Sequence, residues 1–123
     1  MTWRTWAIAL ACAPVVALAA DDHSEAKIIE IANDYGLDPA PLLMTGDVEY
    51  GAYLSGECTT CHQTSGSYDG IPAIIQWDEV YFKVAMHEYK QKTRENPVMQ
   101  LIAGRLGDEE IASLAAYFAQ IEN

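Results

Sequence analysis

Apolar residues recur at helical spacing along most of the chain. Near the C-terminus they stand three or four positions apart, at Ile111, Leu114, Ala115, Phe118 and Ile121. This spacing is the period of an amphipathic helix. The acidic residues at 108–110 precede these positions, where the positive end of a helix favours carboxylates. No stretch alternates as a strand would, so the pattern predicts an all-α protein.

Two further helices are predicted upstream of that one. The segment 78–92 has two apolar sides, one formed by Val80, Val84 and Ala85 and the other by Phe82, Met86 and Tyr89. A short helix then starts with Asn96 as N-cap and Pro97 at its first position, the place in a helix where proline is favoured. Gly104 is predicted to end this short helix.

The first half of the chain contains two more helix candidates. Residues 24–35 are expected to form a helix with Ser24 as N-cap and Gly36 as the stop, and the proline-containing segment 36–46 reads as a connector. A helix capped by Asp47 is predicted over residues 47–56. Gly51 in its middle indicates close approach of another helix, with Tyr117 or Phe118 expected opposite.

The first 20 residues resemble a secretory signal. Arg4 is the single charge before an apolar, alanine-rich run at 6–20, and small residues favour cleavage after Ala19 or Ala20. The run is too short for a good membrane span. A lipoprotein signal at Cys12 is the less favoured alternative, because "ALAC" would cut the apolar run short.

The exported chain is strongly acidic. Without Arg4 it keeps six Lys and Arg against 18 Asp and Glu, a formal charge of −12. Nucleic acid and anionic membrane are therefore not expected partners. The acid excess serves either solubility or attraction to a basic patch on a partner protein, and no membrane span is expected after the signal.

The motif "CTTCH" at 58–62 carries the chemistry. Zinc sites usually need a second cysteine pair, and a thioredoxin-like site needs a strand–helix–strand setting. Neither is visible. A haem attachment site fits, because Cys58 and Cys61 can bind its two vinyl groups while His62 ligates the iron.

With these motifs, the chain from about Asp47 to Ile121 resembles a class I c-type cytochrome. The likeness rests on Gly51, "CTTCH", "GIPAI", Met99 in "NPVM", and "LGDEEIASLAAYF". It is most similar to the monohaem subunit of flavocytochrome c sulfide dehydrogenases and to cytochrome c4/c553-like domains. Two places depart from the family pattern, Ile75–Gln76 and Lys92–Thr93–Arg94, and the turns there are expected to differ.

The resemblance implies an all-α fold, with three to five helices around one covalent haem c. The expected divisions are a signal at 1–20, an N-terminal helical extension and connector at 21–46, and a cytochrome domain at 47–123.

The resemblance also implies the residues around the haem. Met99 becomes the second axial ligand, chosen over Met44, Met86, His23 and His87. Met86 is expected in the core and His87 in solvent. The carbonyl of Pro72 is expected to accept the other ring N–H of His62, which orients a ligating histidine. Trp77, Arg94 and Tyr68 are candidates to bond the haem propionates.

A second metal site is a minor hypothesis at the N-terminus. After cleavage behind Ala20, the mature chain would begin Asp21-Asp22-His23, which can wrap Cu(II). A polar helix cap is the favoured interpretation of the same residues.

The expected function is periplasmic one-electron transfer, with no catalysis by this chain alone. Either it is a haem subunit taking electrons from a flavoprotein sulfide dehydrogenase, or it is a free shuttle between respiratory or photosynthetic complexes. An enzymatic haem would follow if Met99 were not a ligand. The segment 21–44 discriminates between the subunit and the shuttle, because a minimal shuttle does not need it and its helix can either seal against a partner or fold back on its own domain.

Overall fold

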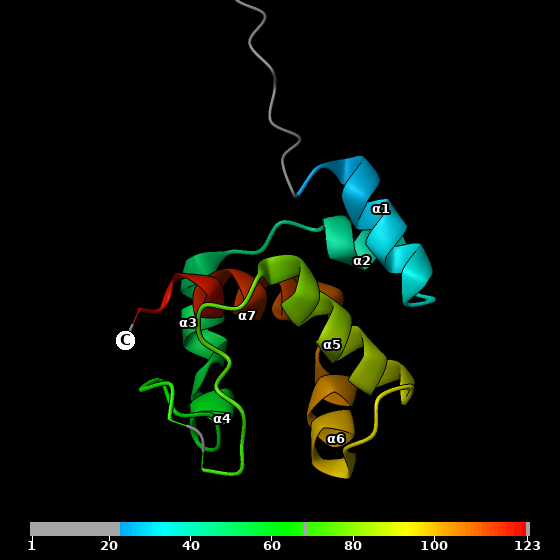
Figure 1. The fold of residues 1–123 in the computed structure, drawn as a ribbon. Helices are drawn as coiled ribbons and strands as arrows, with labels where there is room; N and C mark the ends of the chain where they lie inside the picture. Colours follow the sequence, from blue (N-terminus) through cyan, green and yellow to red (C-terminus); the bar gives the residue numbers. More distant parts are fainter. Residues whose placement is uncertain (1–22, 68, 123) are drawn as a thin grey trace, which may run out of the picture.

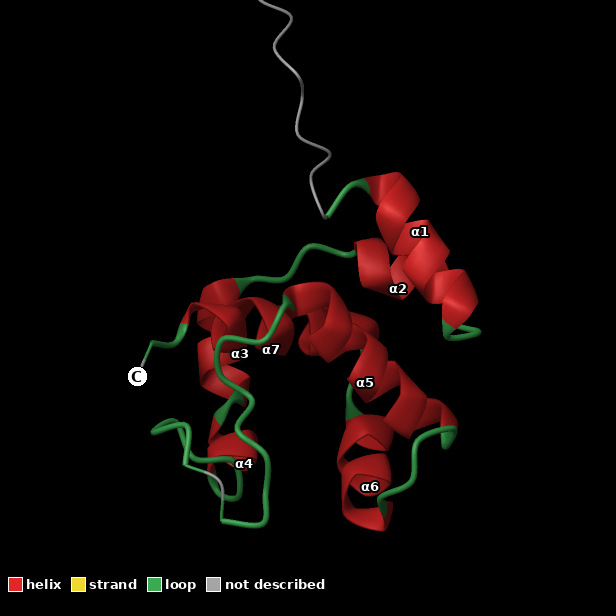
Figure 2. Cartoon of the chain, in the orientation of Figure 1, coloured by secondary structure: helices red, strands yellow, loops and turns green. Residues whose placement is uncertain are grey.

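The structure is a computed structural model that describes residues 23–67 and 69–122. Over these residues it contains seven helices and no strand (Figures 1 and 2), so the predicted all-α class is confirmed. The helices are α1 Glu25–Asp34, α2 Pro39–Leu43, α3 Val48–Leu54, α4 Gly56–Thr59, α5 Glu79–Gln91, α6 Pro97–Arg105 and α7 Asp108–Gln120.

Some of the sequence predictions fall outside the described residues. The signal segment, both cleavage sites, Cys12, the first two residues of the copper motif and Tyr68 all belong to this group. Within the part that is described, no helix has the length and apolarity needed to cross a bilayer.

The N-terminal extension has one predicted helix and one that was missed. α1 starts where Ser24 accepts the backbone N–H of Lys27 at 3.3 Å, and it ends before Gly36, whose φ of 65° terminates the helix. The predicted connector 36–46 contains α2, which Asp38 caps by accepting the N–H of Ala40 at 2.9 Å. A single helical turn with two prolines carries too few apolar positions to show a period.

The extension folds back on its own domain. Ile28, Ile31, Ala32, Leu37 and Leu42 form one buried cluster with Val80 and Val84 of α5. Figure 1 shows α1 and α2 together beside one end of α5, on the side away from α4 and α6.

Lys83 fixes this packing from α5. The residue is 5 % exposed, and its ammonium donates to the carbonyl oxygens of Leu42, at 2.6 Å, and Met44, at 3.1 Å. Because these carbonyls belong to the C-terminal end of α2, the buried charge meets the negative end of a helix. The open question about segment 21–44 is therefore answered for the described residues, which pack on α5.

The two apolar sides predicted for the α5 segment are both present. Val80 and Val84 face the extension, whereas Phe82 and Met86 join the main core with residues of α6 and α7. The prediction for Ala85 was wrong: it was assigned to the side of Val80 and Val84, but it lines a cavity together with Phe82 and Met86. A helix of 13 residues thus has both of its apolar sides covered.

α3 and α7 cross with their backbones in contact. A Cβ on Gly51 would overlap the carbonyl of Ser113 and lie 2.8 Å from Cβ of Tyr117. The expected contact with Tyr117 is confirmed, and Ser113 is the partner that the sequence did not indicate. Phe118 instead stacks on Phe82 in the core, with ring centroids 5.9 Å apart.

Two helix boundaries differ from the prediction. The helix expected over 47–56 divides at Ser55 into α3 and α4, so Cys58 lies inside α4 rather than after a helix. Gly104 does not end α6, which continues to Arg105 and is capped at Leu106. Gly104 keeps a negative φ, so nothing in its backbone terminates the helix.

Each of the two departures from the family pattern contains one left-handed residue. Gln76 has φ 58° in Ile75–Gln76, and Lys92 has φ 63° in Lys92–Thr93–Arg94. The N–H of Gln76 donates to the carbonyl of Phe118 at 2.8 Å, which ties this turn to α7. Surrounding contacts therefore hold a conformation that non-glycine residues rarely adopt.

We expect Gly51→Ala to destabilise the protein by more than about 2 kcal/mol, because the new methyl group cannot fit between two packed backbones. Gly104→Ala is the matched control: apart from its chain neighbours and the backbone of its own helix, no atom lies within 4 Å of its Cβ position in α6, so a gain of about 0.5–1 kcal/mol is expected. Urea unfolding measures both, and equal effects would contradict the close α3–α7 crossing.

Candidate functional site

An apolar cavity of about 320 Å³ brings most of the predicted site residues together. Its walls come from α4, the loop 70–77, α5 and the first turns of α6. Cys58, Cys61, His62, Pro72, Trp77, Arg94 and Met99 all line it. The apolar lining includes Ile74, Phe82, Met86 and Ile102.

α4 and the turn after it place the motif on this cavity. The N–H of Cys61 donates to the carbonyl of Cys58 at 3.2 Å, and the N–H of His62 donates to the same oxygen at 2.8 Å. Both thiols are free; Cys58 is half-buried and Cys61 exposed. Burial, with a smaller contribution from Glu57, raises the pKa of Cys58 to about 11. Cys58 is therefore a neutral thiol near pH 7.

The ring of His62 is held by a single backbone oxygen. Its Nδ1 lies 2.7 Å from the carbonyl oxygen of Pro72. A carbonyl can only accept, so Nδ1 carries the proton and Nε2 keeps the lone pair that a metal requires. The hydrogen bond implied by the resemblance is thus present.

Met99 enters the cavity from the first turn of α6. The side chain of Asn96 accepts the N–H groups of Val98 and Met99, each at 3.1 Å, which fixes the start of this helix. Met86 also touches the cavity and is 5 % exposed within the core, as expected. Met44 lies elsewhere, beside a second groove between the extension and α5.

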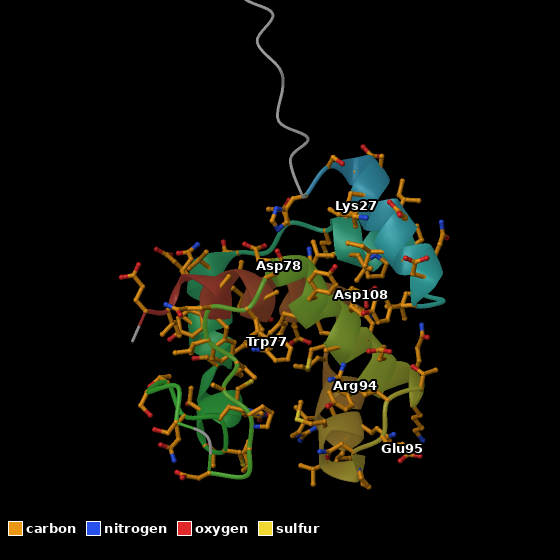
Figure 3. The ribbon with its side chains drawn as sticks, viewed as in Figure 1. Lys27, Trp77, Asp78, Arg94, Glu95 and Asp108 are labelled. Atoms are coloured by element: carbon orange, nitrogen blue, oxygen red, sulfur yellow. The ribbon has the colours of Figure 1, made fainter. Side chains whose placement is uncertain are left out.

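Trp77 and Arg94 flank the cavity from the loops before and after α5 (Figure 3). Trp77 meets Phe82 edge to face, with ring centroids 6.5 Å apart. Arg94 lies over the ring of Tyr89 and pairs with Glu88, with Nη1 and Oε2 3.2 Å apart. Arg94 therefore already has an anionic partner in this structure. Tyr89 and Glu88 were not singled out as site residues, although Tyr89 falls on the predicted 82–86–89 side of α5.

The two histidines considered for other metal roles lie away from the cavity. His23 bonds the carboxylate of Asp78, the N-cap of α5. His87 was expected in solvent, but it is 6 % exposed and its Nε2 has no hydrogen-bond partner. The prediction was wrong because His87 shares a face of α5 with Lys83 and Lys90, and other elements cover that face. Lys83 contacts α2, and Lys90 contacts Leu106 and Asp108 at the start of α7.

No group of three or more His, Cys, Asp or Glu side chains within residues 23–67 and 69–122 could hold a metal ion. A zinc site of the usual kind needs four such ligands.

The residues present fit a haem. The cavity is apolar, and its lining includes two free thiols, the histidine His62 and two methionines, Met86 in the core and Met99 at the first turn of α6. Cys58 and Cys61 would hold such a group covalently, while His62 and Met99 would supply its axial ligands.

No family model matches the chain. A protein of Stutzerimonas stutzeri named "Thiosulfate dehydrogenase electron acceptor" is 34 % identical over 62 residues. The match covers 48 % of this chain and 29 % of that protein.

His87 should make stability depend on pH. Burial lowers the pKa of His87 from 6.5. The charge of Asp108 on α7 acts in the opposite direction and raises this pKa, whereas Lys90 and Lys83 on α5 lower it further. Below pH 6.5 the unfolded chain then binds a proton that the folded chain binds less well, so stability falls as pH drops through the unfolded-state pKa.

His87→Leu should remove this loss between about pH 7 and pH 5. The measurement is the free energy of unfolding of both proteins across that range. If the two curves run parallel, His87 is not the cause.

Proposed function

We propose that the chain transfers single electrons through one covalent haem c. The observation that carries this proposal is the shared lining of one cavity by Cys58, Cys61, His62 and Met99. The hydrogen bond of His62 to Pro72 supports it further, because it leaves Nε2 as the available nitrogen. A bound haem supplies an Fe(II)/Fe(III) couple.

The protein's own residues restrict what this site does. With His62 and Met99 both as ligands, no coordination position stays open for a substrate. Ile74, Phe82 and Met86 are buried in the core and give the cavity an apolar wall. An apolar wall and a thioether ligand both favour a raised reduction potential.

The electron donor is proposed to be a dehydrogenase, with the chain acting as its haem-bearing acceptor. The name of the Stutzerimonas relative supports the proposal that this chain accepts electrons from a dehydrogenase. The resemblance to flavocytochrome c supports the narrower version, in which the donor is a flavoprotein sulfide dehydrogenase. A periplasmic location belongs to the same proposal and rests on the signal-like residues 1–20.

A free shuttle is the second candidate, and one observation favours it. The isoleucine-rich helix α1 could either seal against a partner or fold back on its own domain, and Ile28 and Ile31 are buried in one cluster with Val80 and Val84 of α5. That surface is therefore used within the chain. A permanent partner would have to bind elsewhere.

Met99→Ala should lower the reduction potential and let added cyanide or CO bind, because it removes the thioether ligand. Met44→Ala is the matched control, since Met44 is 37 % exposed and lines the other groove. Redox titration and visible spectra report both effects. An unchanged Met99→Ala spectrum would exclude Met99 as a ligand.

Size-exclusion chromatography of a native periplasmic extract separates the two partner hypotheses. Haem absorbance that co-elutes with flavin absorbance supports a dehydrogenase subunit. Haem that elutes alone, at the size of a single exported chain, supports a shuttle and contradicts a stable complex with a flavoprotein.

A further inference from the structure

Arg94 is the one Lys or Arg side chain among the described residues that line the cavity. It stands in the loop between α5 and α6, and its side chain is 45 % exposed. Its guanidinium lies 5.2 Å from the centroid of the Tyr89 ring. A positive charge at this wall would act on any charged group held in the cavity.

Glu88 holds this loop through both its backbone and its side chain. Its carbonyl oxygen accepts the N–H of Thr93 at 3.0 Å, the N–H of Arg94 at 3.3 Å and the hydroxyl of Thr93 at 3.2 Å. Its carboxylate pairs with Arg94 at 3.2 Å and is only 18 % exposed. The carbonyl of Arg94 in turn accepts the side-chain amide of Gln100 at 2.9 Å, which links the loop to α6.

We propose that Glu88 is a positioning residue for the haem site: it holds Arg94 against the cavity wall and cancels its charge. The inference rests on the proposed haem and names a determinant of its reduction potential. Neither Glu88 nor its pairing was indicated by the sequence motifs, which pointed to Arg94 alone.

The sign of the effect follows from electrostatics. Oxidation adds one positive charge at the iron, so a nearby cation disfavours the oxidised state and raises the potential. Glu88 offsets this cation, and its removal exposes the charge of Arg94 to the site. Because Glu88 is largely buried, solvent screens this pair less than a fully exposed one.

The other charged residue of the cavity wall is Glu57, which is paired differently. Its carboxylate lies 3.6 Å from Nη2 of Arg105, and the side chains of Glu57 and Arg105 are 71 % and 58 % exposed. Solvent therefore screens this pair more strongly. Of the two pairs, Glu88 with Arg94 has the greater influence on the site.

The test is a redox titration of the intact haem protein and four variants. Glu88→Gln keeps an oxygen that can accept from Arg94 and keeps the backbone bonds, but removes the charge, so the midpoint potential should rise. Arg94→Gln leaves Glu88 uncompensated, so the potential should fall. The double variant should return near the starting value.

Asp108→Asn is the control for overall charge. Asp108 pairs with Lys90, two residues from Glu88 on α5, at 3.6 Å, and neither residue lines the cavity. Its neutralisation should shift the potential less than Glu88→Gln does. Equal shifts in the two variants, or no shift in both Glu88→Gln and Arg94→Gln, would overturn the inference. A protein that binds no haem would instead contradict the proposed function.

Discussion

The contact on which the rest of the site depends is the crossing of α3 over α7 at Gly51. The absence of a side chain lets the backbone of α3 rest on the carbonyl of Ser113, and the N–H of Asp47 donates to the Ser113 hydroxyl at 3.1 Å. α3 continues directly into α4, which carries Cys58. The position of the thiols and of His62 therefore follows from how closely two helices approach.

α5 provides the second constraint, because one helix serves two clusters. Its Val80 and Val84 hold the extension, and its Phe82 and Met86 form the wall of the cavity. The buried ammonium of Lys83 fastens α2 to the same helix. The extension thus acts within the chain by covering α5, so its presence does not by itself indicate a partner subunit.

Much of this was predictable from the sequence, and the failures have physical causes. Helix caps such as Ser24, Asp47 and Asn96 act locally, so their residue types can be recognised in the sequence. The two sides of α5 follow from its period. The burial of His87, the helix at 39–43 and the pairing of Glu88 with Arg94 depend on which elements pack together, and no local pattern encodes that. The helix end predicted at Gly104 was wrong because a glycine inside a helix resembles a stop signal in the sequence.

The most direct test of the proposed haem is the mass and spectrum of the protein after denaturation. The protein would be isolated from a periplasm that assembles c-type cytochromes. The proposal predicts one haem retained through two thioether bonds, at Cys58 and Cys61, with the visible spectrum of a low-spin haem in the native state. Two unmodified thiols on a colourless folded chain would contradict it.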